Sequence, residues 1–230
     1  MSHWNVADVM TVGAISVQRD TPFRQIVDIM ELHNINAVPV VDAADHVIGL
    51  VSSADLMSKI EYAGNHGRAL FERQRVRAAR VKSTGTAAGD LMTTPVVTVS
   101  ARTSLVAAAK VMDEGRLKRL PVVDQDGRLV GMVTRRDLLK VFLRPDKQIR
   151  AEIVDEVLDG IAGVEPTQVT VDVGDGVVTL LGEVDRRSLL PVVRRLVERV
   201  DGVVDVVSHL TYAVDDTRQP PAGVASGRAY

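Results

Sequence analysis

The chain repeats part of itself at a spacing of 82 residues, the distance from Asp8 to Asp90, and this duplication limits its possible folds more than any other feature. The matching segments are residues 8–11 with 90–93, 39–42 with 121–124, and 49–56 with 131–138. Three blocks that keep one spacing without a gap indicate a duplicated fold unit. Because a unit of about fifty residues buries a poor core alone, we expect the two copies to pack together.

Each copy predicts the order strand, helix, strand, strand, helix. In the first copy, residues 15–17 form a short strand, and Thr21 caps a helix that begins at Pro22. The apolar runs at residues 38–41 and 47–51 then form the two strands of a hairpin.

The second copy contains sharper boundary signals. Its first helix begins at Thr103 and ends near Gly115, because glycine is the usual residue at a helix C-terminus. Asp126-Gly127 is typical of a hairpin turn. The last helix of each copy follows from Asp55 or Asp137.

Three motifs therefore occur twice and in the same order: Asp-hydrophobic-Met-Thr, Pro-Val-Val-Asp and Gly-x-Val-[Ser/Thr]-x-x-Asp. In these motifs residues 3–143 resemble a pair of CBS domains, with residues 3–62 as the first domain and residues 88–143 as the second. The resemblance implies a mixed α/β (α+β) fold built from a duplicated β-α-β-β-α unit. It also implies two clefts that bind AMP, ATP, S-adenosylmethionine or a related adenosyl ligand, and a homodimer of such pairs.

The resemblance assigns a role to Asp55 and Asp137, since the aspartate at this position of the family accepts hydrogen bonds from ribose hydroxyls. Ser52 and Thr134 lie where a strand ends and a helix begins, and free N–H groups at a helix start suit a phosphate. A second interpretation needs no ligand. Ser or Thr followed three residues later by an acidic residue is also a capping box, which stabilises a helix start.

The two copies differ in charge around these positions. The second copy has Lys118-Arg119 and Arg135-Arg136 where the first has Asn36-Ala37 and Ser53-Ala54. Because basic side chains strengthen phosphate binding, we predict that the cleft with Thr134 and Asp137 is the better nucleotide site, completed by backbone groups near Thr94 and Val96. The alternative is that these cations only solvate the surface.

A third unit follows at residues 146–212. Its periodicity predicts helix, strand, strand, helix, strand, with a strongly amphipathic helix from Leu189 to Val200. This αββαβ order resembles a BON domain, as do Val-x-Leu-x-Gly-x-Val at residues 178–184 and Asp-Gly-Val-Val-x-Val at residues 201–206. The resemblance implies a membrane-surface, ligand-binding or scaffold role. Residues 144–214 carry 13 acidic and 8 basic side chains, and this excess of acid opposes anionic lipid and favours a protein contact.

The remaining segments are a basic linker at residues 63–87 and a tail at residues 215–230 that we expect to be disordered. The linker contains one aromatic residue, Phe71, and so offers no stacking platform for bases. We therefore do not expect nucleic acid as a partner.

The sequence lacks the patterns of an enzyme. It has no cysteine, no phosphate-binding Gly-x-x-x-x-Gly-Lys motif and no Gly-x-Ser-x-Gly motif, and its five histidines are scattered without metal-ligand spacing. We predict no catalytic residue, no metal site and no required cofactor. Without a signal peptide or an apolar span, a cytoplasmic location is expected.

Three functions remain open at this stage. The first is a regulatory protein that senses an adenine nucleotide. The second is a scaffold without ligand, in which the repeats only dimerise and the third unit binds a protein. The third is a protein tethered to a membrane surface through residues 146–212.

Overall fold

The computed structural model describes residues 4–61 and 84–217 and divides them into two compact units. One unit is Asn5–Leu138, and the other joins the chain from Leu139 onward with Trp4. Residues 63–83 of the basic linker and residues 218–230 of the predicted tail lie outside the described residues. In the described part of the chain, no helix has the length and apolar character needed to cross a membrane.

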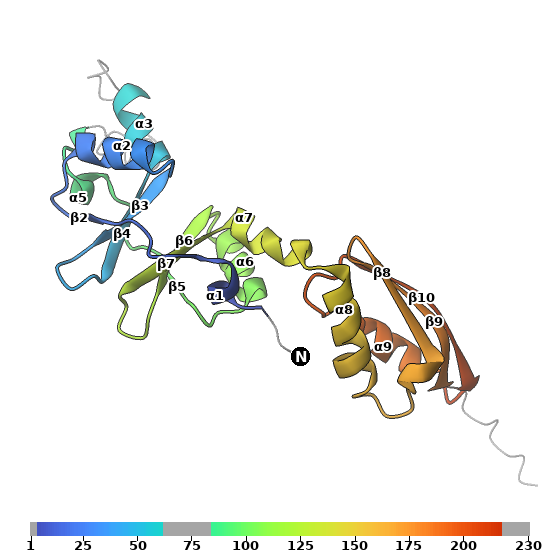
Figure 1. Ribbon diagram of the computed structural model, residues 1–230. Helices are drawn as coiled ribbons and strands as arrows, with labels where there is room; N and C mark the ends of the chain where they lie inside the picture. The colour runs from blue at the N-terminus through green and yellow to red at the C-terminus, as the bar shows by residue number, and fades with distance from the viewer. Residues whose placement is uncertain (1–3, 62–83, 218–230) are drawn as a thin grey trace, which may run out of the picture. The chain divides into compact units, whose positions relative to one another are not determined.

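The first copy of the repeat contains a three-stranded sheet in the order β2-β3-β4, with β3 and β4 antiparallel and β2 parallel to β3 (Figure 1). Its elements are α1 (Val6–Val9), β1 (Thr11–Val12), β2 (Val17–Gln18), α2 (Phe23–Leu32), β3 (Ala37–Val41), β4 (Val47–Ser52) and α3 (Ser53–Glu61).

The second copy repeats this order without a counterpart of β1, and the shared order β-α-β-β-α confirms the predicted mixed α/β fold. Its elements are α5 (Ala88–Leu91), β5 (Val99–Ser100), α6 (Leu105–Glu114), β6 (Arg119–Val123), β7 (Leu129–Thr134) and α7 (Arg135–Leu138). The sheet runs β1-β7-β6-β5, so it includes a strand from the first copy.

The predicted helix caps are partly wrong. Pro22 and Ser104, and not Thr21 and Thr103, occupy the N-cap positions of α2 and α6. The Thr21 hydroxyl instead accepts a hydrogen bond from the Gln18 N–H at 3.0 Å, within the preceding turn. Gly115 is the C-cap of α6, as predicted.

The leading segment of each copy pairs with the last strand of the other copy. Strand β1 runs antiparallel to β7, with Thr11 opposite Met132. At the equivalent position of the repeat, Thr93 donates to the Leu50 carbonyl at 2.8 Å, and Leu50 donates back at 3.2 Å. In both pairings the leading segment of one copy hydrogen-bonds to the edge of the last strand of the other copy. We call this arrangement the crossing of the two copies; it satisfies backbone groups at the edge of each strand.

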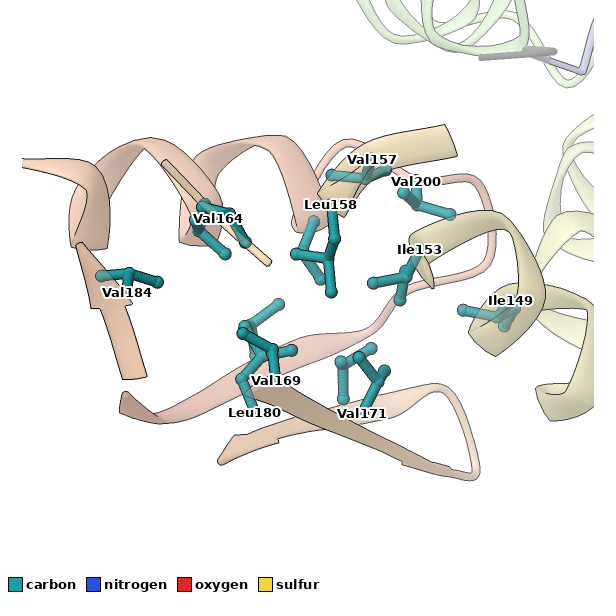
Figure 2. Close-up of a cluster of buried hydrophobic side chains, with 14 residues drawn as sticks. Ile149, Ile153, Val157, Leu158, Val164, Val169, Val171, Leu180, Val184 and Val200 are labelled. Carbon is teal, nitrogen blue, oxygen red and sulfur yellow. The ribbon is translucent and has the colours of Figure 1, made fainter. Parts of the chain in front are cut away.

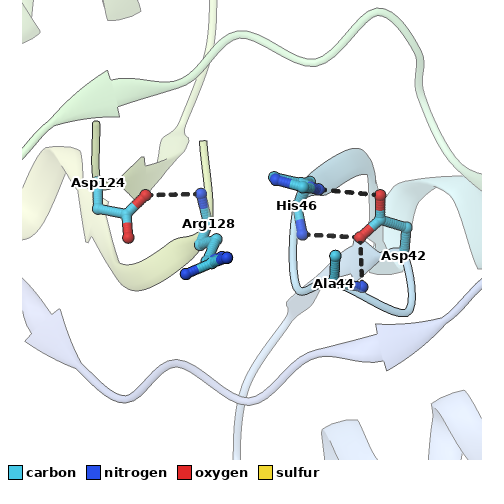
Figure 3. A network of polar contacts seen from close by, with 5 residues as sticks. All are labelled: Asp42, Ala44, His46, Asp124 and Arg128. Atoms are coloured by element: carbon cyan, nitrogen blue, oxygen red, sulfur yellow. Dashed lines mark hydrogen bonds and ion pairs between the residues drawn. The ribbon is translucent and has the colours of Figure 1, made fainter. Parts of the chain in front are cut away.

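The hairpin turns of the two copies also meet. His46 and Arg128 form an antiparallel bridge, and the Leu129 N–H donates to the Asp45 carbonyl at 3.0 Å. Asp42 and Asp124 each brace their own turn through backbone N–H groups (Figure 3). The His46 N–H, followed by the Ala44 N–H, stabilises the Asp42 carboxylate and lowers its pKa.

The core of the first copy lies between its sheet and its helices. Ile26 and Met30 lie one turn apart on α2 and are buried against Val38, Val40 and Val51. Val38 and Val40 alternate with Pro39 along β3, and all three are buried, which is typical of a strand with both faces covered.

The second unit has helices on one side of a sheet in the order β10-β9-β8 (Figure 1). Its elements are η1 (Leu139–Leu143), α8 (Asp146–Glu152), the π-helix η2 (Ile153–Leu158), η3 (Pro166–Gln168), β8 (Val169–Gly174), β9 (Val177–Arg186), α9 (Leu189–Val197) and β10 (Asp205–Val214). The first helix predicted for this unit thus changes from α to π geometry at Ile153.

The core of this unit fills the space between helices and sheet. Figure 2 shows Ile153 and Leu158 of η2 pointing toward Val169, Val171 and Leu180 of the sheet. The opposite face of β10 remains open, because exposed residues such as Val207 alternate with buried Val206.

We predict that Gly131→Ala destabilises the unit Asn5–Leu138. A Cβ at this position would come within 2.6 Å of the Thr11 carbonyl oxygen, so β1 would have to move off β7. Overpacking of this kind costs about 1–3 kcal/mol, which calorimetric or urea unfolding would measure. Gly174→Ala is the matched control, because nothing lies within 4 Å of its Cβ. Equal stability of the two variants would contradict the close crossing.

Candidate functional site

Two of the clefts in the unit Asn5–Leu138 contain the aspartates predicted for the binding sites. The first, which we call the Asp137 cleft, has a volume of about 570 Å³. It combines the end of β7 in the second copy with the leading segment and the end of α2 in the first. Its lining includes Thr11, Ile15, Asn36, Arg119, Arg136 and Asp137. This volume falls within the range of about 300–1,000 Å³ that is usual for small-molecule sites.

The second cleft, which we call the Asp55 cleft, has a volume of about 280 Å³. The two copies exchange their roles in forming its walls. Here the end of β4 in the first copy meets the leading segment and the end of α6 in the second. Representative lining residues are Ser52, Asp55, Thr93, Val96, Arg116 and Lys118. Each cleft is therefore built from both copies.

Each cleft contains an aspartate that caps a helix. Asp137 Oδ2 accepts hydrogen bonds from the N–H and the hydroxyl of Thr134 at 2.9 and 2.7 Å. Asp55 Oδ2 accepts the same pair from Ser52 at 2.9 and 2.6 Å. The capping interpretation thus describes how one oxygen of each carboxylate is used. Both aspartates also line their clefts, so capping and ligand binding are compatible.

Arg119 lines both clefts. Its side chain extends from the start of β6, and its Nη1 donates to Asn36 Oδ1 of the first copy. Burial of the guanidinium lowers the pKa of Arg119, although the group stays cationic at neutral pH. A partly desolvated cation between two clefts is a strong potential partner for a phosphate in either.

Arg135 is turned away from both clefts. Its Nε donates to the Leu117 carbonyl at 2.8 Å and its Nη2 to the Met112 carbonyl at 3.3 Å, so the guanidinium binds carbonyls at the end of α6. Arg135 was expected beside Asp137 as a phosphate ligand, and this placement is corrected. The neighbouring Arg136 does line the Asp137 cleft.

The predicted grouping of site residues is corrected as well. Lys118 and Val96 were placed with Asp137, but they line the Asp55 cleft. Thr94 is exposed and lines neither cleft, although Thr93 and Pro95 on either side line the Asp55 cleft. The reason is the crossing, because each leading segment lies beside the last strand of the other copy.

Sequence reasoning missed two contributions. Thr93 donates through its hydroxyl to Asp55 Oδ1 at 3.4 Å. Residues 33–37, which follow α2, form a wall of the Asp137 cleft, and Arg116 and Leu117 extend the equivalent wall of the Asp55 cleft beside the predicted Lys118 and Arg119. Asn34 and Arg116 occupy equivalent positions of the repeat, and both adopt a positive φ in the structure, so the chain turns sharply there.

Comparison with known proteins places these units among described families. The CBS domain model matches residues 6–62 and 88–144, and the BON domain model matches residues 145–214. The two CBS matches contain the two aspartates and both sets of cleft residues.

Several known proteins are similar to the repeated unit. The chain is 30% identical over 154 residues to the CBS domain-containing protein CBSX1, chloroplastic, of Arabidopsis thaliana, covering 59% of this chain and 65% of CBSX1. It is 29% identical over 133 residues to inosine-5'-monophosphate dehydrogenase of Methanocaldococcus jannaschii, covering 22% of that enzyme. The chain thus spans less than two thirds of either relative.

A solved structure gives a further comparison. The crystal structure of CBSX2 in complex with AMP superposes with a TM-score of 0.54 at 29% identity, covering 61% of this chain and 97% of CBSX2.

We predict that Asp137→Ala and Asp55→Ala each destabilise the protein without any ligand present. Each substitution removes two hydrogen bonds at a helix start, and loss of such a cap costs about 1 kcal/mol. Urea unfolding in nucleotide-free buffer measures the loss. Asp28→Ala, which removes an exposed carboxylate in α2, is the control and should not lower stability.

Proposed function

Because this chain carries a pair of CBS domains followed by a BON domain, we propose that it is a regulatory protein that binds an adenine nucleotide in the clefts of its CBS pair. The observation that carries the proposal is the Asp137 cleft, where a carboxylate, two guanidinium groups and an apolar wall surround about 570 Å³. A nucleotide offers a matching set of groups: ribose hydroxyls, a phosphate and an apolar base.

Each part of the nucleotide has a proposed partner. The carboxylate of Asp137 accepts hydrogen bonds from the ribose hydroxyls while it keeps its cap on Thr134. Arg119 and Arg136 bind the phosphate, because charge-assisted hydrogen bonds are the strongest available there. Helix α7 has four residues, so its dipole adds little to phosphate binding. The base packs against Ile15, Ile35 and Met132.

The complex of CBSX2 with AMP supports this choice of ligand class. AMP is therefore the first ligand to test, followed by ADP, ATP and S-adenosylmethionine. The Asp55 cleft, with about 280 Å³ and three cations, is proposed as a second and smaller site. Binding regulates the protein by favouring one arrangement of the two copies, since every ligand in a cleft touches both.

The proposal extends to the rest of the assembly. The CBS pair forms a homodimer in the cytoplasm, the chain has no catalytic activity, and the BON domain passes the nucleotide signal to a protein partner. The acidic charge of residues 144–214 favours a basic protein surface over anionic lipid.

Isothermal titration calorimetry with the four ligands tests the proposal. We expect AMP to bind and Asp137→Ala to weaken that binding by about tenfold or more, since hydrogen bonds to a charged group contribute about 1.5–3 kcal/mol. Asp28→Ala should bind like the wild-type protein. If none of the four ligands produces heat or raises the unfolding temperature, the sensor function is wrong and the scaffold function takes its place.

We further predict that Arg119→Ala weakens AMP binding in both clefts by about tenfold but leaves adenosine binding nearly unchanged, because only AMP presents a phosphate. Titrations in Asp55→Ala and Asp137→Ala backgrounds isolate the two clefts. Arg136→Ala should affect the Asp137 cleft alone, and Lys118→Ala the Asp55 cleft alone. An equal loss of adenosine and AMP binding on Arg119→Ala would show that the guanidinium only supports the fold.

A further inference from the structure

The unit formed by Trp4 and the chain from Leu139 onward contains a cavity of its own, with a volume of about 360 Å³. Its lining includes Trp4, Arg144, Gln148, Glu152, Asp155 and Glu156. The acidic side chains all come from α8 and the π-helix η2, where the change of helix geometry at Ile153 falls between Glu152 and Asp155. None of these residues contributes to the nucleotide clefts.

Glu152 is a buried carboxylate with one oxygen left over. Its side chain is only 6% exposed, and its Oε2 accepts a hydrogen bond from Arg144 Nη2 at 2.6 Å. Oε1 is buried and has no hydrogen-bond partner among the described residues, although Glu152 lines the cavity. A buried carboxylate oxygen without a donor is unfavourable, so a donor that reaches Oε1 from the cavity would be stabilised by it.

The charge of the cavity favours a cation. Arg144 contributes one positive charge against the three carboxylates of Glu152, Asp155 and Glu156, and the Arg144 guanidinium is already bound to Glu152 and to the Asp201 carbonyl at 2.8 Å. The lining therefore has an excess of two negative charges. Charges in a recess interact more strongly than charges on open surface, because water screens them less.

Trp4 adds an aromatic surface to this acidic recess. Its backbone N–H donates to Asp201 Oδ2 at 2.5 Å, which fixes the residue against the unit. Indole is the best of the aromatic side chains for binding a cation over its face. No three carboxylates or imidazoles in the described part of the chain converge as a metal site would require. An organic cation, with both an apolar body and a charged end, fits this lining better than a metal ion.

We propose that this cavity is a binding site for a small organic cation that carries a primary ammonium or guanidinium group. Glu152 Oε1 receives a hydrogen bond from the cation, Asp155 and Glu156 supply the remaining charge, and Trp4 covers its apolar part. The need for an N–H donor at Oε1 sets the specificity, because a quaternary ammonium ion has the charge and no donor.

The chain has a single tryptophan, so its intrinsic fluorescence reports directly on this site. We expect agmatine, which carries both groups, to change the Trp4 fluorescence of the full chain in a saturable way. Tetramethylammonium and K⁺ at the same concentrations should bind at least about tenfold more weakly, because they have no N–H donor. An equal response to all three, or no response to agmatine, overturns the proposal.

Two charge-removing variants distinguish specific binding in the cavity from a general attraction of the acidic unit for cations. Asp155→Asn should weaken agmatine binding by about fivefold and leaves the buried Arg144–Glu152 pair intact. Asp159→Asn, which removes an equal charge from a residue outside the cavity lining, should stay within about twofold of wild type. Equal losses in the two variants would show that only the net charge attracts agmatine. The titration needs no nucleotide, so its outcome is independent of that of the AMP experiment.

Discussion

The hydrogen bonds that cross the two repeats determine the candidate site. Thr93 pairs with Leu50, and β1 pairs with β7 at the equivalent place, so each leading segment completes the sheet of the other copy. The crossing gives both clefts walls from both copies. Glycine at positions 49 and 131 makes it possible, because a Cβ there would collide with Met92 or with the Thr11 carbonyl.

The aspartates of the two clefts make the same hydrogen bonds, whereas the residues that line the rest of each cleft differ. Asp55 and Asp137 each give one oxygen to a helix cap, which is enough to stabilise the fold without a ligand. Their presence alone therefore does not distinguish a sensor from a scaffold. The distinguishing features are volume and charge: the Asp137 cleft is about twice as large, and the Asp55 cleft has one more cation.

Local features of the fold were predictable from the sequence, and the partner of each segment was not. The order of elements, the hairpin turns and the helix end at Gly115 depend on neighbours in the chain, and they appear where periodicity and turn residues predicted them. Periodicity does not say which sheet edge a two-residue strand will join. Val96 was therefore assigned to the wrong aspartate, although the motif that precedes it was recognised.

The same limit applies to long side chains. Arg135 follows Thr134 directly, and its position in the motif suggested a phosphate ligand, yet its guanidinium reaches back to carbonyls at the end of α6. In the first copy the equivalent residue is Ser53, which is too short for that contact. Arg135, which is an additional cation of the second copy, thus stabilises the end of α6. A comparison of the charges of the two copies could not show this role.

Arg119 makes the two proposed binding sites depend on each other. It lines both clefts, and the equivalent residue of the first copy is Ala37, so the two clefts share this one guanidinium. Its hydrogen bond to Asn36 holds it between the clefts. A phosphate that draws Arg119 into one cleft removes a donor from the other, so the two sites would bind with negative coupling. Because such coupling is reciprocal, occupancy of the smaller cleft would weaken the larger one by the same factor.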